Sequence, residues 1–321
     1  MYFGLPEDAL ALREGLRELL TAACTPATIR AAWDGDGCDD LWKQLGAFGV
    51  LGVLVDEARG GLGLDELSFV AALEEAGYAG VPGPLVETTA YLPEHDLPLD
   101  GSVRIAVQRV GALRVPNAGV ATHVHREDDG ALLDDFTALP FESVDRSRAV
   151  GSIVAPSGEA YSSHLSITWD DQPQAGSRAA ARATLGTAAF LCGLARRQTD
   201  LTVAYLKERK QFGVVIGTYQ GLKHPLASAV VDAEFAWPAV LRAAQSLATD
   251  DPAAAAHVST AKALASDAAY RLSRVCLQAH GAMGYTVEYD LHLFMKRTWA
   301  LAKDWGTSSQ HRELIATELG L

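Results

Sequence analysis

Two short segments carry most of the residue types that can hold a charged ligand. The first, "ERKQFG", places Arg209 next to Gln211 and Phe212, and Gly213 is expected to end a helix there. A guanidinium group is planar and can bind two phosphate oxygens at once, while the amide adds a hydrogen bond and the phenyl ring a flat apolar surface. These groups suit a phosphate-binding site, but the segment taken alone favours a charged, frayed helix end.

The second segment is "QAHGAMGYTVEYD". Gln278 supplies an amide, and Gly281 and Gly284 allow unusual backbone dihedrals and the close approach of a ligand to the main chain. Taken alone, the segment favours an ordinary helix end followed by a glycine-rich turn.

A third segment, "KDWGTSSQ", has the small residues of a ligand-facing turn around Gly306. Trp305 stands where we expect a carboxylate, and an indole N–H donates a hydrogen bond but cannot accept a proton. Asp304 precedes it, and in a continuing helix its side chain points about 100° away. Trp305 therefore cannot act as a base in this turn.

Composition limits the function classes. The chain has 321 residues, 49% of them hydrophobic, which predicts a globular protein of two or three domains. Its net charge of −13 argues against a nucleic-acid partner or an anionic membrane surface, since both need clustered Lys and Arg. Neither a signal peptide nor a membrane span is expected. Four scattered cysteines indicate reduced thiols in the cytoplasm.

Periodicity predicts a mainly α protein with a small β domain. Residues 1–98 form an N-terminal helical domain, 99–175 a reduced middle β domain, and 176–321 a C-terminal four-helix bundle. The bundle helices are expected at 178–210, 219–248, 252–282 and 289–304. In the middle domain, His123 and His125 alternate on a strand and indicate a polar strand face rather than a metal site. Trp169 is expected to pack.

Together, the motifs resemble the acyl-CoA dehydrogenase family. The family patterns R-x-[TQ]-F-G and Q-x-x-G-G-x-G-[YF] correspond to Arg209-x-Gln211-Phe212-Gly213 and to Gln278-x-x-Gly281-Ala282-x-Gly284-Tyr285. Between them, "YQGLKHPLA" resembles the opening of the family's next helix. "LGVLVDEARGGLGLDELSFVAALEEAGYA" resembles an N-terminal family segment, and the middle region shows little likeness.

The resemblance implies a shared FAD. In the family, these two segments of one subunit hold the ADP part of the FAD that belongs to the neighbouring subunit. Carried over, the cofactor-binding residues are Arg209, Gln211, Phe212, Gln278, Gly281 and Ala282, with Ala282 in place of a family glycine. The family's middle-domain flavin segment has no counterpart here, and no metal is implied.

The family's base positions are empty. The catalytic Glu belongs to a "Y-E-G-T-S-Q" turn, and Trp305 occupies its position in this chain. Some relatives carry the base on the first bundle helix, where this chain has Ala183 or Thr184. No catalytic residue is therefore assigned.

This pattern resembles the degenerate subunit of heteromeric α2β2 steroid-CoA dehydrogenases of actinobacteria. The chain is then a partner of a catalytic subunit and supplies half of that subunit's FAD site for the α,β-desaturation of an acyl-CoA. The acyl-CoA, a steroid side-chain CoA by analogy, is bound mainly by the partner. Two alternatives stay open: a homomeric enzyme that uses a base such as Asp304, and a helical scaffold or acyl-CoA-binding protein without flavin.

Overall fold

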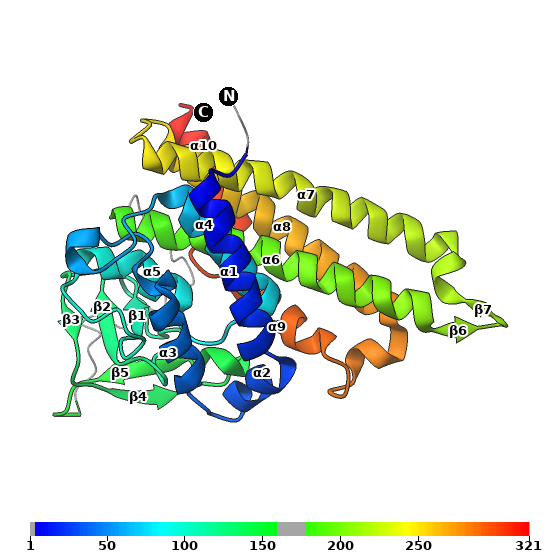
Figure 1. The fold of residues 1–321 in the computed structure, drawn as a ribbon, viewed down its shortest axis with the longest axis horizontal. Helices are drawn as coiled ribbons and strands as arrows, with labels where there is room; N and C mark the ends of the chain where they lie inside the picture. The colour runs from blue at the N-terminus through cyan, green and yellow to red at the C-terminus, as the bar shows by residue number, and fades with distance from the viewer. Residues whose placement is uncertain (1–3, 159–176, 321) are drawn as a thin grey trace. The chain divides into compact units, whose positions relative to one another are not determined.

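The computed structural model describes residues 4–158 and 177–320 (Figure 1). The chain divides into two compact units that alternate along the sequence. The first unit spans 1–17, 66–80 and 184–321, and the second spans 18–65 and 81–183. These units follow packing rather than sequence order, so the three domains expected at 1–98, 99–175 and 176–321 remain a prediction.

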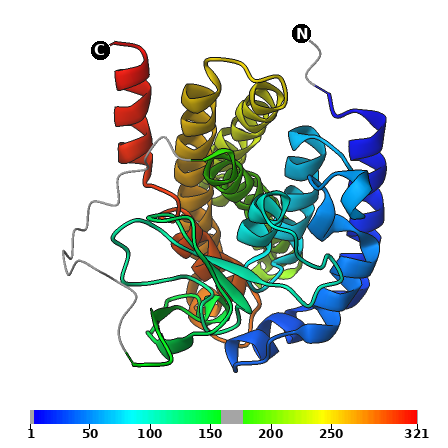
Figure 2. The ribbon, with the colours of Figure 1, turned by 90° about the vertical axis from the view of Figure 1, so that its left-hand side faces the viewer.

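Long helices build the first unit. α7 (Gln220–Ala248) lies along α8 (Ala254–His280), and Figure 2 shows the two side by side in yellow and gold. α8 also contacts α9 (Leu291–Leu301) and α10 (Ser308–Glu318). The predicted bundle helices are confirmed to within a few residues, and α10 is an addition beyond them. The helices with residues in this unit are α1 (Glu7–Ala23), α4 (Glu66–Ala79), α6 (Arg178–Glu208), α7 (Gln220–Ala248), α8 (Ala254–His280), α9 (Leu291–Leu301) and α10 (Ser308–Glu318).

α4 and α6 approach so closely that each needs a glycine at the contact. A Cβ atom on Gly193 of α6 would lie 1.9 Å from the carbonyl oxygen of Glu74. One on Gly77 of α4 would lie 2.1 Å from the carbonyl oxygen of Phe190. Interiors are close-packed, so any larger residue would force the two backbones apart.

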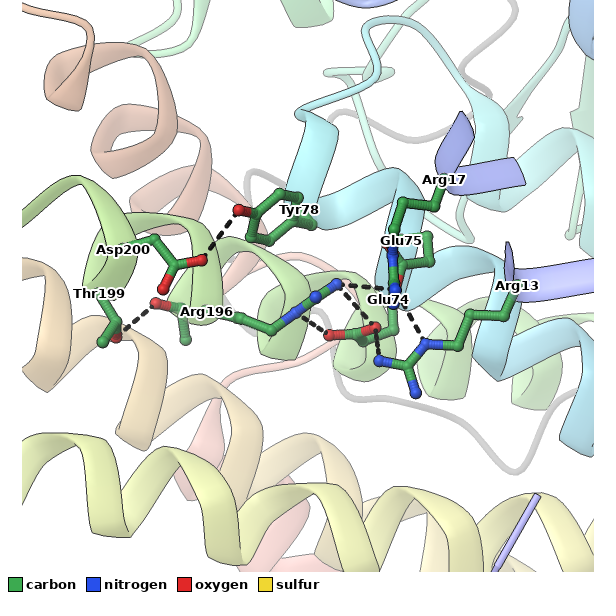
Figure 3. Close-up of polar contacts among 9 residues, drawn as sticks. Arg13, Arg17, Glu74, Glu75, Tyr78, Arg196, Thr199 and Asp200 are labelled. Carbon is green, nitrogen blue, oxygen red and sulfur yellow. Dashed lines mark hydrogen bonds and ion pairs between the residues drawn. The ribbon is translucent and has the colours of Figure 1, made fainter. Parts of the chain in front are cut away.

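Buried charges cross the same helix contact (Figure 3). Glu74 and Glu75 of α4 are 5% and 1% exposed. Arg196 of α6 donates from Nε to Glu74 Oε1 at 2.7 Å and from Nη2 to Glu75 Oε1 at 2.9 Å. Arg13 and Arg17 of α1 donate to Glu75 at 2.8 and 2.6 Å. The guanidinium groups compensate the buried carboxylates, so the cluster joins α1, α4 and α6.

The second unit combines short helices with two small sheets. In the first sheet, β1 pairs in parallel with β2, and β2 pairs with antiparallel β3, while β4 and β5 form an antiparallel pair. The elements wholly within this unit are α2 (Pro26–Trp33), α3 (Asp39–Phe48), α5 (Leu85–Tyr91), β1 (Ile105–Gln108), β2 (His123–Arg126), β3 (Leu132–Leu133), β4 (Thr137–Pro140) and β5 (Gly151–Val154). The residues buried between the strands and the neighbouring loop are Ala106, Val115, Ala118, Val124 and Ile153.

These elements confirm the predicted fold class, mainly α with a small β part. Trp169, expected to pack in the middle region, lies outside the described residues. Within the part of the chain that the structure describes, no helix is long and apolar enough to cross a membrane.

Candidate functional site

Arg209 lies between the end of α6 and a β-hairpin. α6 ends at Glu208, and β6 (Lys210–Gln211) pairs with antiparallel β7 (Val214–Val215). Phe212 and Gly213 make the turn with φ of 52° and 80°. The expectation that Gly213 ends the helix is therefore wrong, because its positive φ serves a two-residue hairpin turn. Phe212 is 94% exposed at the tip.

The second predicted segment follows α8. Gln278 is exposed on the last turn of α8, and Gly281 ends that helix with φ 58° and ψ −136°, a conformation that side-chain-bearing residues avoid. A 3₁₀ turn, η6 (Gly281–Tyr285), then exposes Ala282. Gly284 is buried beneath the turn, where a Cβ atom would lie 2.9 Å from a methyl carbon of Leu277. The expected helix end with a glycine-rich turn is confirmed.

An aromatic stack connects the two segments. β6 and β7 lie at the same end of the first unit as the last turns of α8 (Figure 1). The ring centroids of Tyr205 on α6 and His280 on α8 lie 4.5 Å apart, and those of His280 and Tyr289 lie 4.8 Å apart. Burial lowers the pKa of His280, which favours the neutral ring. No prediction from the sequence included this stack, although Tyr205 lies on the last turn of α6, four residues before Arg209.

A groove of about 490 Å³ lies beside Gln278, between the start of α7 and the last turns of α8. One wall is apolar, while two guanidinium groups and an amide supply hydrogen-bond donors. Of the six predicted cofactor residues, only Gln278 lines the groove. The lining residues that matter here are Leu222, Pro225, Tyr270, Arg271, Arg274 and Gln278.

The hairpin is tied to the start of α7, which forms one side of this groove. The hydroxyl of Tyr219, the residue before α7, donates to the Gln211 carbonyl oxygen at 3.5 Å. Gly281 has no atom within 4 Å of the place where a Cβ would stand, so its backbone is accessible. Exposed donors on Arg209 and Gln278 and the exposed ring of Phe212 fit the ADP half of a flavin dinucleotide.

The turn around Trp305 is buried and is held by hydrogen bonds from residues of the first unit. Trp305 is 6% exposed, has a φ of 54°, and donates its backbone N–H to Asp304 Oδ1 at 3.0 Å. Its carbonyl oxygen accepts from Nε2 of His311 at 2.8 Å, and that of Gly306 accepts from Nζ of Lys262 at 3.0 Å. Burial and the charge of Lys262 lower the pKa of His311 to about 4, so its imidazole is neutral at pH 7 and Nε2–H can donate.

The second unit contains a histidine pair. His95 Nε2 and His125 Nδ1 lie 3.2 Å apart, and the His125 ring packs 4.7 Å from that of Tyr91. The predicted strand with His123 and His125 is confirmed as β2. Burial, with His95 acting in the same direction, lowers the pKa of His125 to about 4. Among residues 4–158 and 177–320, no group of three or more His, Cys, Asp or Glu could hold a metal ion.

Family models match both helical ends of the chain. Residues 6–93 match the model for the acyl-CoA dehydrogenase N-terminal domain, and residues 177–320 match that for the acyl-CoA dehydrogenase C-terminal domain. The resemblance drawn from the motifs is thereby confirmed.

Individual proteins extend these likenesses to the whole chain. The acyl-CoA dehydrogenase IpdE2 of Mycolicibacterium smegmatis is 31% identical over 330 residues, which cover 98% of this chain and 100% of IpdE2. A variant of the Tcur3481-Tcur3483 steroid ACAD shares the fold with a TM-score of 0.77 at 22% identity, over 98% of both chains. A glutaryl-CoA dehydrogenase of Mycobacterium smegmatis in complex with FADH2 has a TM-score of 0.75 at 17% identity, over 98% of this chain and 95% of that one.

Proposed function

Because the chain belongs to the acyl-CoA dehydrogenase family, we propose that it is the partner subunit of a heteromeric, FAD-dependent acyl-CoA dehydrogenase. It has no catalytic base of its own and contributes half of the FAD site of a catalytic subunit. One contrast carries the proposal. Arg209 and Gln278 are exposed at one end of the helices, whereas Trp305 is buried at the family's base position.

Six residues would hold the ADP half of the partner's FAD. The guanidinium of Arg209 would bind phosphate oxygens, the amide of Gln278 would add hydrogen bonds, and the open space at Gly281 would let the cofactor approach the main chain. The bound flavin supplies hydride acceptance for the α,β-desaturation of an acyl-CoA. The full set is Arg209, Gln211, Phe212, Gln278, Gly281 and Ala282.

The absence of a base rests on the chemistry of three positions. Trp305 can only donate a hydrogen bond, so it cannot remove a proton. Ala183 and Thr184, at the alternative position on α6, are 0% and 8% exposed and carry no carboxylate. A catalytic base must reach its substrate proton with a free lone pair, and we therefore assign that role to the partner.

Exposed apolar side chains at the same end support a partner subunit. Phe212, Tyr285 and Val287 are 94%, 75% and 70% exposed, and clustered apolar exposure is typical of interaction surfaces. We propose an α2β2 assembly in the cytoplasm in which the catalytic subunit binds most of the acyl-CoA. The likeness to a steroid ACAD supports a steroid side-chain CoA as substrate.

Co-purification with a catalytic acyl-CoA dehydrogenase subunit that carries the family's Glu tests the proposal. Arg209→Ala should weaken FAD retention by the complex roughly tenfold to a hundredfold, because a charge-assisted hydrogen bond is worth about 1.5–3 kcal/mol. The matched control is Lys207→Ala, which removes an exposed cation from the same end of α6 and should leave the flavin content unchanged. The proposal would be wrong if this chain alone gave stable, yellow protein with acyl-CoA dehydrogenase activity.

Two alternatives make different predictions for the same complex. In a homomeric enzyme that uses Asp304 as base, Asp304→Asn abolishes turnover, whereas our proposal predicts little effect because the Asn carbonyl oxygen can still accept the Trp305 N–H. In a flavin-free scaffold or acyl-CoA-binding protein, no partner brings FAD and Arg209→Ala changes nothing.

A further inference from the structure

The groove beside Gln278 is basic in an otherwise acidic chain. The chain's net charge is −13, yet the charged residues that line the groove are Arg271 and Arg274, with no carboxylate among its described lining residues. The residues that α7 contributes to the groove, Gly221, Leu222 and Pro225, are all apolar. Guanidinium groups beside an apolar wall suit a nucleotide, which combines phosphates with a flat ring system.

The two arginines differ in the contacts that their side chains make. The guanidinium of Arg271 forms an ion pair with the carboxylate of Asp232 on α7. The side chain of Arg274 has no hydrogen bond or ion pair with any residue in the described ranges. It lies four residues before Gln278, so both side chains leave the same face of α8. Arg274 is thus the cation that a ligand held by Gln278 would meet.

We propose that Arg274 is a further nucleotide-binding residue of this chain. Its guanidinium binds the diphosphate of an adenosine diphosphate group, and the adenosine packs on the apolar wall of the groove. Both FAD and the coenzyme A thioester contain such a group. The choice of FAD rests on the proposed function, whereas the role of Arg274 rests on the groove itself.

Calorimetric titration of the full chain with ADP tests this role. Arg274→Ala should weaken ADP binding roughly tenfold or more, since it removes a charge-assisted contact. Arg274→Lys should fall in between, because it keeps the charge but loses the planar fork. The control is Arg312→Ala on α10, where an exposed arginine pairs with Asp267 outside the groove; it should bind ADP like the wild type. Added salt should narrow the gap between wild type and Arg274→Ala.

Displacement of ADP by FAD and by coenzyme A identifies the source of the nucleotide. If FAD displaces ADP from the wild type, and displaces it less well from Arg274→Ala, the inference is supported in full. Competition by coenzyme A alone keeps the role of Arg274 but overturns its assignment to FAD. Two results overturn the inference: equal ADP binding by the wild type and Arg274→Ala, and no ADP binding by the wild type at millimolar ADP. Either result counts against Arg274 even if Arg209→Ala releases flavin from the complex. A complex that never carries flavin defeats the proposed function and leaves the ADP result to stand.

Discussion

Replacing Arg196 by alanine should destabilise the first unit strongly. Arg196 donates two hydrogen bonds to Glu74, at 2.7 and 3.1 Å, and one to Glu75 at 2.9 Å, and its guanidinium lies 4.1 Å from the centre of the Tyr78 ring. Removing one partner from a fully buried ion pair costs about 3–5 kcal/mol. Because Arg13 still contacts both carboxylates and the Arg196 side chain is 31% exposed, we expect a loss of about 2–3 kcal/mol.

Arg242 provides a matched control. Its side chain is also 31% exposed, but its partner Asp251 is 26% exposed, against 6% for the Glu74 side chain. Arg242→Ala should therefore cost less than about 1 kcal/mol, as expected for a solvent-accessible ion pair. Urea unfolding followed by circular dichroism measures both losses. Equal losses in the two variants would refute the assignment of the larger effect to buried carboxylates.

The same comparison has a pH dependence with a defined sign. Burial alone would raise the pKa of Glu75, but hydrogen bonds from Arg17 and Arg13 and the charge of Arg196 outweigh it and lower the pKa to about 2. Its contribution to stability is present above pH 4.5 and is lost as the pH falls towards 2. Burial raises the pKa of the neighbouring Glu74, so that group protonates earlier. The gap between wild type and Arg196→Ala should shrink over this window; a constant gap would mean that the carboxylates are not its cause.

Two further predictions concern packing and pH. Gly193→Ala should lower the free energy of unfolding by about 3 kcal/mol or prevent folding, because the new Cβ would lie 1.9 Å from the Glu74 carbonyl oxygen. The control is Gly221→Ala, whose new Cβ would have no atom within 4 Å and which should keep the thermal midpoint of the wild type. Equal thermal midpoints for the two variants would contradict the close contact at Gly193. Burial lowers the pKa of His125 to about 4, so its contribution to stability is present above pH 6.5 and is lost as the pH falls through 4. His125→Gln should flatten the stability curve of the second unit over that range, and an unchanged slope would exclude His125 as its source.

The bundle helices could be predicted because their signal is local. α7 and α8 run for 29 and 27 residues, with apolar residues recurring at helical spacing, and the structure begins and ends them close to the predicted bounds. The helix end at Gly281 could likewise be predicted, because glycines directly after a helical pattern are a local signal of a helix C-terminus.

The rest depends on contacts between residues far apart in sequence. The hairpin after Arg209 has two residues per strand, too few for an alternating pattern, so the segment resembled a helix end. The packing of α4 with residues 184–321 depends on Gly77 and Gly193 and on Glu74 with Arg196. None of these four residues carries a local sequence signal for its contact, because each partner lies more than 100 positions away in the chain.

Two separate networks along α8 support our proposal that this chain has no catalytic base but has a cofactor surface. In the first half of α8, Lys262 donates a hydrogen bond to the carbonyl oxygen of Gly306, which follows Trp305. At the end of α8, His280 stacks on Tyr205 beside the hairpin. Lys262 and Gln278 lie roughly 24 Å apart along the helix at 1.5 Å per residue. Effects of substitutions at such distances are normally independent. An indole in the turn can therefore be accommodated locally by Lys262 and His311, without altering the end of α8 that we assign to the partner's FAD.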